Sequence, residues 1–127
     1  MVRKIIHTDR APAAIGPYSQ AVQAGHSVYF SGQIPLDPDT GALVEGDFET
    51  QVRRAFDNLK AVAEAAGGSL DHVVRLGLYL VDLQQFAAVN RVMEEYFEAP
   101  FPARSTVQVS ALPKGAVFEV DAVMQLE

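Results

Sequence analysis

Two stretches with helical periodicity, 48–66 and 83–97, interrupt a chain that otherwise reads as short β-strands. In both stretches apolar residues recur three and four positions apart, which is typical of a helix with one buried face. Asp47 is placed to cap the first helix at its start and Gly67 at its end. Strands are predicted in six segments: 4–7, 20–24, 27–31, 72–80, 103–109 and 116–125.

This order of elements, β-β-β-α-β-α-β-β, predicts an α+β fold with two helices on one face of a mixed sheet. Gly25-His26 is a two-residue hairpin signal between the second and third strands. We expect the last two strands to pair like a hairpin around 111–115. The other sheet face then carries charged and apolar groups without helices to cover it. Because such a face is often completed by another subunit, we expect homo-oligomers.

The composition favours one globular domain over residues 1–127, with 49% hydrophobic and 20% charged residues. A net charge of -6 argues against a general binder of nucleic-acid backbones. We find neither a membrane-spanning apolar run nor a signal-peptide pattern, so we expect a cytoplasmic protein. The absence of cysteine excludes disulfides, thiolate metal sites and a cysteine nucleophile.

Arg104 is the first candidate for a ligand-binding side chain. In the predicted strand 103–109, strict alternation puts it on the same face as Thr106. A guanidinium stays protonated and presents a planar set of donors that suits a carboxylate held by two parallel hydrogen bonds. In a closed pocket Arg104 would therefore bind a small organic acid. The alternative is an ion pair with Glu119 or Asp121 on a solvated sheet face.

Glu119 and Asp121 alternate with the apolar residues of the last strand and therefore share one face. If the last two strands form a hairpin, that face also holds Arg104 and Thr106. The sequence leaves open which of the two carboxylates lies nearer Arg104. In a confined site, such a carboxylate can order or deprotonate water.

Four further candidates each have a simpler structural alternative. Asn90 lies on or beside the apolar stripe of the second helix, where its amide either lines a pocket or ties the helix to a loop. Ser31-Gly32 ends a strand, where glycine lets the backbone approach a ligand or simply permits a bend. Tyr18 follows Pro17 on a stiff loop, where its ring serves either chemistry or packing.

Other chemistries find little support in the sequence. His7, His26 and His72 lack metal-ligand spacing. The glycines are scattered among turns, without the clustering of a phosphate-binding loop. No Ser-His-Asp arrangement is indicated.

Several of the candidate residues fall within separated motifs that occur in a characteristic order. The motifs are AAIGPYSQA at 13–21, SGQIP at 31–35, the segment 82–90, FPARS at 101–105, and LPKG at 112–115 followed by Glu119. In this order and over essentially the whole chain, the sequence resembles the RidA/YjgF family of reactive-intermediate deaminases.

The resemblance implies a chorismate-mutase-like α+β fold and a homotrimer with pockets at the subunit interfaces. It also implies hydrolysis of 2-imino acids, such as 2-iminobutanoate and 2-iminopropanoate, and of their enamines to 2-oxo acids and ammonia. Pyridoxal-phosphate dehydratases acting on serine and threonine release such intermediates. No metal or cofactor is implied.

The resemblance also implies roles for individual residues. Arg104 matches the family's carboxylate-binding arginine, Glu119 the glutamate that positions the attacking water, and Tyr18 a further residue of the catalytic site. The remaining pocket residues implied are Ser31, Gly32, Asn90 and Thr106, some of them supplied by a neighbouring chain. Thr106 stands where many members carry cysteine, so no thiol role is expected, and hydrolysis does not need one.

Two other functions remain open at this point. The chain could bind 2-oxo or related small acids without turning them over, using the same Arg104. It could also be an endoribonuclease or translation inhibitor, an activity attributed to some relatives. The negative charge and the lack of a basic, aromatic stripe count against RNA binding.

Overall fold

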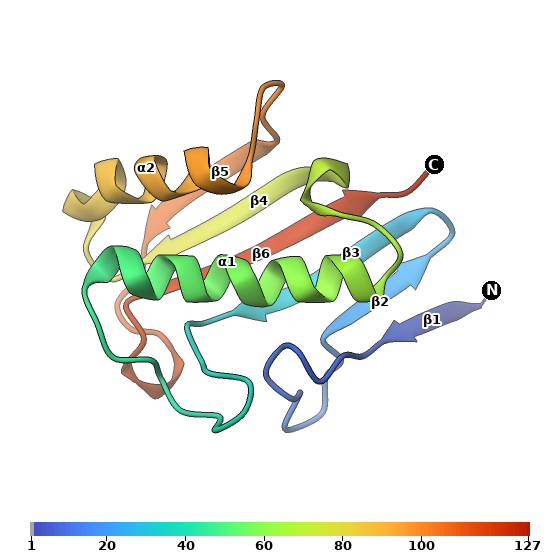
Figure 1. Ribbon diagram of the computed structural model, residues 1–127, viewed down its shortest axis with the longest axis horizontal. Coiled ribbons are helices and arrows are strands. Elements are labelled where there is room, and N and C mark those ends of the chain that lie inside the picture. Colours follow the sequence, from blue (N-terminus) through green and yellow to red (C-terminus); the bar gives the residue numbers. More distant parts are fainter. Residues whose placement is uncertain (1) are drawn as a thin grey trace.

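The computed structural model describes residues 2–127, and Figure 1 shows two long helices lying on the same side of one sheet. The strands are β1 (Arg3–Ile6), β2 (Ala21–Ala24), β3 (Ser27–Gln33), β4 (Val73–Leu80), β5 (Ala103–Gln108) and β6 (Phe118–Gln125). The helices are α1 (Phe48–Ala65) and α2 (Phe86–Tyr96), and single 3-10 turns occur at Leu70–His72, Leu83–Gln85 and Pro113–Gly115. The predicted order of elements and the α+β class are confirmed.

The sheet has the strand order β1-β2-β3-β6-β4-β5. Neighbouring strands are antiparallel except for β4 and β5, which run parallel, so the predicted mixed sheet is confirmed. The predicted hairpin between the last two strands is wrong, because β4 lies between β5 and β6. Parallel strands need a long crossover connection, and α2 supplies it between β4 and β5.

Local turn and capping signals are realised where the sequence predicts them. Ala24 pairs with Ser27 across a two-residue turn, in which Gly25 adopts a φ of 62°. Asp47 accepts a hydrogen bond of 2.9 Å from the Thr50 N–H at the start of α1. The Thr50 side chain, and after it this backbone N–H, lowers the pKa of Asp47. The predicted second helix begins later than expected, at Phe86, because residues 83–85 form a 3-10 turn.

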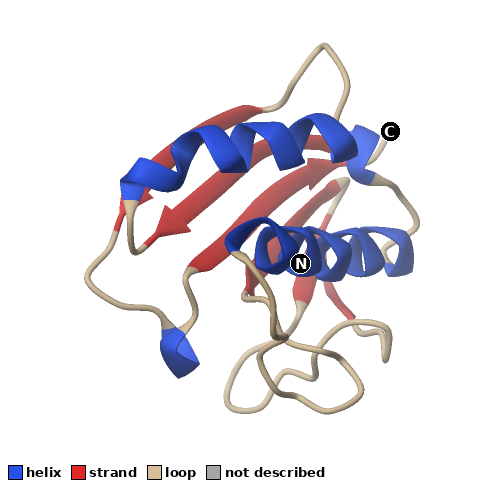
Figure 2. Ribbon diagram, turned by 60° about the vertical axis from the view of Figure 1, so that its left-hand side comes forward, coloured by secondary structure: helices blue, strands red, loops and turns tan. Residues whose placement is uncertain are grey.

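The hydrophobic core lies between the helices and one face of the sheet, and Figure 2 shows both helices on that face. Its fully buried side chains come from α1, α2, β3, β4 and β6; they include Val52, Phe56, Leu59, Val62, Val89, Val92, Val28, Leu76, Leu78, Phe118 and Val120. Strand β6 alternates strictly between buried and half-buried residues, so every second side chain points to the opposite face.

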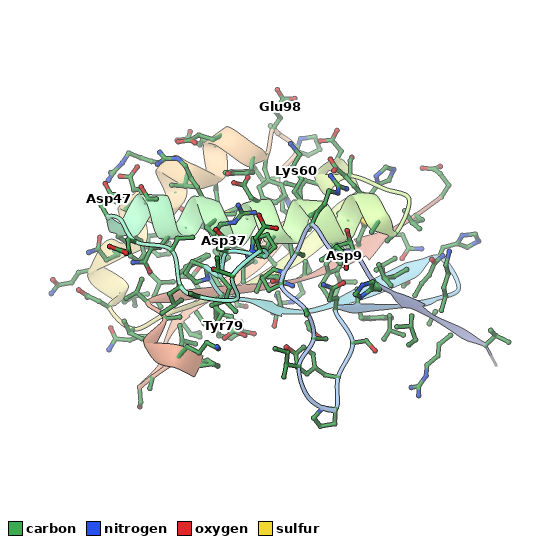
Figure 3. All side chains as sticks on the ribbon, turned by 60° about the horizontal axis from the view of Figure 1, so that its bottom comes forward. Asp9, Asp37, Asp47, Lys60, Tyr79 and Glu98 are labelled. Atoms are coloured by element: carbon green, nitrogen blue, oxygen red, sulfur yellow. The ribbon has the colours of Figure 1, made fainter. Side chains whose placement is uncertain are left out.

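That opposite face, which we call the helix-free face, carries Glu119 and Asp121. They pair in register with Tyr79 and Gly77 of β4. In Figure 3, Tyr79 lies on the far side of the sheet from α1, which carries Lys60. The two faces therefore have different chemistry, one apolar and packed, the other rich in carboxylates and tyrosine.

Of the helices in residues 2–127, none combines the length and the apolar character needed to cross a membrane.

Candidate active site

The structure brings four of the predicted site residues together in one cavity of about 590 Å³, which we call the Glu119 cavity. Tyr18, Ser31, Gly32 and Glu119 all line it. Much of the remaining wall is apolar and comes from the loops before β2 and after β3; it includes Pro12, Ala13, Ile15, Ile34 and Leu36. The cavity thus combines a small polar centre with an apolar wall, the usual character of a site for a small organic molecule.

Glu119 projects from β6 across the backbone of β3. A Cβ atom at position 32 would overlap the Glu119 carboxylate and lie 2.8 Å from its Cδ. Gly32 lines the cavity, and its missing side chain leaves room for Glu119; the approach of a ligand to its backbone stays a prediction. Burial raises the pKa of Glu119, and the nearby Asp121 raises it further. The carboxyl group is therefore held in a confined place where it accepts a proton more readily than an exposed glutamate.

Asp121 is engaged by its neighbours on the helix-free face. The Tyr79 hydroxyl donates a hydrogen bond of 2.9 Å to its Oδ2, and Gly77 leaves the space that the Asp121 carboxylate occupies. Burial and this hydrogen bond raise the pKa of Tyr79. Among residues 2–127 no side chain donates a hydrogen bond to Glu119, so of the two carboxylates Glu119 is the one available to a water molecule or a ligand.

The Ser31 hydroxyl is engaged in a hydrogen bond to the backbone of the same chain. Ser31 Oγ donates to the Ser19 carbonyl, and the Ser31 backbone N–H donates to the Gln20 carbonyl at 3.0 Å. Ser31 therefore fixes the loop that carries Tyr18, whose side chain is 53% exposed at the cavity.

Arg104 lies in a different cavity, of about 400 Å³, which we call the Arg104 cavity. Asn90, Met93, Glu94, Phe101 and Pro102 line it together with Arg104. The Arg104 Nη1 lies 3.0 Å from Met93 Sδ, and the guanidinium carbon lies 5.1 Å from the centre of the Phe86 ring. This is a cation–π arrangement. Within the described chain no ion pair includes Arg104, so the alternative of a bond to Glu119 or Asp121 is wrong.

The expectation that Arg104 and Thr106 share a face with Glu119 and Asp121 is also wrong. Arg104 pairs in register with the buried Leu76 and Thr106 with the buried Leu78, so both lie on the helix side. The other face of β5, with Ala103, Ser105 and Val107, is more apolar in sequence, yet Val107 is 44% exposed. Helix α2 packs against the face that carries Arg104 and Thr106, although this face is the more polar of the two.

The separation between Arg104 and Glu119 follows from this topology. Neighbouring strands are about 4.8 Å apart, so β5 and β6, which flank β4, lie roughly 10 Å apart. The two side chains also leave opposite faces of the sheet. Within one chain they cannot contact the same small molecule.

The two other predicted residues lie on the Arg104 side. Asn90 is half-buried and lines the Arg104 cavity, and in residues 2–127 its side chain makes no hydrogen bond, which favours a pocket wall over a tie to a loop. The Thr106 hydroxyl is buried and has no partner in the same residues. Thr106 lies two residues after Arg104 on the same face of β5, but it lines neither cavity.

No group of three His, Asp or Glu side chains is arranged to hold a metal ion within residues 2–127. His7 contacts the exposed Asp9, and His72 belongs to the capping box of the 3-10 turn at Leu70–His72.

Sequence reasoning did not single out three buried amides at the Glu119 cavity: Gln20 and Gln33, which line it, and Asn58, which lies behind its wall. Gln20 is 2% exposed and Asn58 is fully buried. A signal was available for Asn58, which lies three residues after Ala55 and four before Val62 on the apolar stripe of α1. A polar residue on such a stripe must find buried partners.

Comparisons with known proteins agree with this fold. The family model described as Endoribonuclease L-PSP matches residues 8–125. Protein DfrA of Myxococcus xanthus is 56% identical over 125 residues, covering 97% of this chain and 95% of that protein. The 2-iminobutanoate/2-iminopropanoate deaminase of Dermatophagoides farinae is 46% identical over 125 residues, covering 98% of each.

Among solved structures, E. coli TdcF with bound serine superimposes with a TM-score of 0.93 at 42% identity, covering 98% of this chain and 99% of TdcF. The fold and the two half-buried polar sites thus define an α+β protein of the kind that binds small molecules. The chain belongs to the Endoribonuclease L-PSP family, which is the RidA/YjgF family that its motifs resemble.

Proposed function

We propose that this protein hydrolyses 2-imino acids such as 2-iminobutanoate and 2-iminopropanoate to 2-oxo acids and ammonia. The observation that carries the proposal is that the chain presents two complementary groups in separate cavities: Arg104, which has no ion-pair partner within residues 2–127, and the confined carboxylate of Glu119. Deaminases with this activity in their names are 46% identical to the chain over nearly its full length.

Hydrolysis of an imine needs few catalytic groups. An imine carbon is already electrophilic, and protonation of its nitrogen makes it more so. Water adds to this carbon while its proton passes to the Glu119 carboxylate. The resulting carbinolamine then loses ammonia, taking up a proton at nitrogen and giving one up at oxygen as the carbonyl forms. Positioning and fixed charge supply the acceleration, without a nucleophilic side chain.

The residues divide this work between binding and water activation. Arg104 holds the substrate carboxylate through two parallel hydrogen bonds, with Asn90 in the wall beside it. Glu119 orients the water, with Tyr18 at the rim of the same cavity. Serine, the ligand bound in the TdcF structure, carries a carboxylate and a nitrogen on the same carbon, as a 2-imino acid does.

We further propose that the complete site forms between copies of the chain, in a homotrimer. Arg104 and Glu119 leave opposite faces of the sheet, so a substrate that meets both must meet two chains. The helix-free face supports this assembly, because Ile5 is 54% and Tyr29 is 52% exposed, and Val22 lies between them in register. Light scattering at micromolar concentration should give three times the mass of the chain, and a monomer would contradict the shared site.

The proposal is tested with freshly made substrate. A threonine dehydratase generates 2-iminobutanoate in a buffer that slows its spontaneous hydrolysis, and 2-oxobutanoate is measured with and without this protein. We expect the protein to speed product formation in proportion to its concentration. A binding protein without turnover would leave the rate at the spontaneous value.

The name of the matching family makes endoribonuclease activity the alternative to test. The net charge of -6 argues against RNA as a substrate. Incubation of labelled RNA with highly purified protein should therefore leave the RNA intact. The cytoplasmic location stays a prediction, which fractionation of cells would test.

A further inference from the structure

The wall of the Glu119 cavity is built mainly from irregular backbone. Tyr18 and three of the apolar wall residues belong to the segment 8–19, between β1 and β2, and Ile34 and Leu36 belong to the segment after β3. The first segment is not part of the sheet, and the second has only an isolated antiparallel bridge between Leu36 and Leu43, with backbone hydrogen bonds from Asp37 to Ala42 at 2.8 Å and from Val44 to Pro35 at 3.0 Å. Yet the wall must be placed accurately, because an error of about 1 Å in such a site can cost roughly a hundredfold in rate.

The side chain of Gln20 holds the first segment. Its Oε1 accepts a hydrogen bond of 2.8 Å from the Thr8 N–H. Its Nε2 donates to the carbonyls of Thr8 at 3.0 Å and Pro12 at 2.8 Å, with a longer contact of 3.4 Å to Ala11. One buried amide therefore closes the segment against the start of β2. Tyr18 lies two residues before Gln20, inside the loop that these bonds close.

The side chain of Asn58, which lies on α1, holds the segment after β3 that carries Ile34 and Leu36. Its Nδ2 donates to the carbonyl of Leu36 at 2.9 Å and, at 3.3 Å, to that of Ile34. Its Oδ1 accepts from Arg54 Nε at 3.1 Å. Asn58 is fully buried on α1, so it ties the cavity wall to the buried side of this helix.

We propose that Gln20 and Asn58 are positioning residues for imine hydrolysis, which hold the two irregular walls of the Glu119 cavity at the spacing the substrate requires. The inference rests on the proposed function. Gln20 lines the Glu119 cavity, but the hydrogen bonds of its amide go to segment 8–19, and Asn58 lies behind the cavity wall, so both act through the wall. Gln20 acts through Tyr18 and the apolar rim, and Asn58 acts through Ile34 and Leu36.

Replacement of either amide by alanine leaves backbone carbonyls without donors and lets the wall move. We expect Gln20→Ala and Asn58→Ala each to lower kcat/KM for 2-iminobutanoate about ten- to a hundredfold. Gln20→Glu and Asn58→Asp keep the shape and the acceptor but lose the donors to carbonyls. If the donors fix the wall, these two variants should be impaired nearly as much as the alanine variants.

Val62→Ala is the matched control, because Val62 is fully buried on α1 one turn after Asn58 and lines neither cavity. It weakens the same core without touching the wall. Measured at a temperature where all variants are folded, Val62→Ala should keep wild-type kcat/KM. The inference is overturned if Val62→Ala loses as much activity as the amide variants, because the loss would then reflect stability alone.

A double-mutant cycle tests whether Gln20 acts through Tyr18. If it does, Gln20→Ala should cost clearly less in a Tyr18→Phe background than in the wild type. Full additivity would show that Gln20 has no connection with Tyr18 and would contradict this part of the inference.

Hydrogen exchange separates failure of this inference from failure of the proposed function, because it needs no turnover. The Thr8 amide, which donates to Gln20, should lose protection in Gln20→Ala while amides in the middle of β4 keep theirs. Binding of 2-oxobutanoate, followed by calorimetry, should weaken in the same variants. Unchanged exchange in segment 8–19 and unchanged binding would overturn the inference even if the protein proves not to be a deaminase.

Discussion

Replacing Arg104 by alanine should remove the binding of the substrate carboxylate while leaving the fold intact. Within residues 2–127 the half-buried Arg104 makes no ion pair; its guanidinium lies against a methionine sulfur and the face of Phe86, and such a cation–π contact is worth about 0.5–2 kcal/mol. Removal of one partner of a confined charge pair costs about 2–5 kcal/mol. The effect on substrate should therefore exceed the effect on stability.

Converted at about 1.4 kcal/mol per tenfold, this loss corresponds to a fall in kcat/KM of roughly one and a half to three and a half orders of magnitude. Arg104→Lys should recover little of it, because an ammonium keeps the charge but loses the two-pronged geometry. The assay is the dehydratase-coupled formation of 2-oxobutanoate, combined with thermal unfolding and light scattering.

Arg91→Ala is the matched control, since Arg91 is an exposed arginine on α2 that pairs with Glu49. It removes the same charge close to the site and should leave turnover unchanged. A well-folded, normally assembled Arg104→Ala protein with near-normal imine hydrolysis would refute the carboxylate-binding role.

Three further results are expected. Glu119→Gln should lower turnover more than it weakens 2-oxobutanoate binding. The same variant should be more stable than the wild type at pH 7, because burial and Asp121 raise the pKa of Glu119 and its ionisation therefore costs folding stability once the pH rises through the folded-state pKa. This gain in stability over the wild type should vanish in acid. Unchanged turnover would reduce Glu119 to a structural residue. In the profile of kcat/KM against pH, the acid limb should lie above the ordinary glutamate pKa of 4.5. Asp121→Asn removes the neighbouring charge and should move this limb to lower pH. A limb that does not move would mean that another group titrates. A chelator should leave activity intact, and loss of turnover restored by one added metal would show that the site was misread.

The local features of the fold were predictable because they depend on neighbouring residues. The spacing of Val52, Phe56 and Leu59 defines the buried face of α1, and Asp47 and Gly25 mark a cap and a turn by their own chemistry. The partner of β5 was not predictable in this way. Pairing with β4 rather than β6 depends on where α2 packs, and no residue within 103–109 reports it.

The same limit applied to the site. Tyr18, Ser31, Gly32 and Glu119 come together as the motifs indicate, because β3 and β6 are neighbours. The face of Arg104 was misassigned, since alternation groups residues into two sets but does not say which set meets a helix. Gln20 was missed because its importance lies in four hydrogen bonds to a loop whose path the sequence does not give.

The central claim is that Arg104 of one chain and Glu119 of another complete a single hydrolytic site, and subunit mixing tests it most directly. Arg104→Ala and Glu119→Gln proteins are each assayed alone, then dissociated, mixed in equal amounts and reassembled. If sites form between chains of a trimer, about a quarter of them in the mixture carry both an intact arginine and an intact glutamate. We predict that 2-iminobutanoate hydrolysis rises from near the spontaneous rate to about a quarter of the wild-type activity. A mixture no more active than its two components would contradict the shared site.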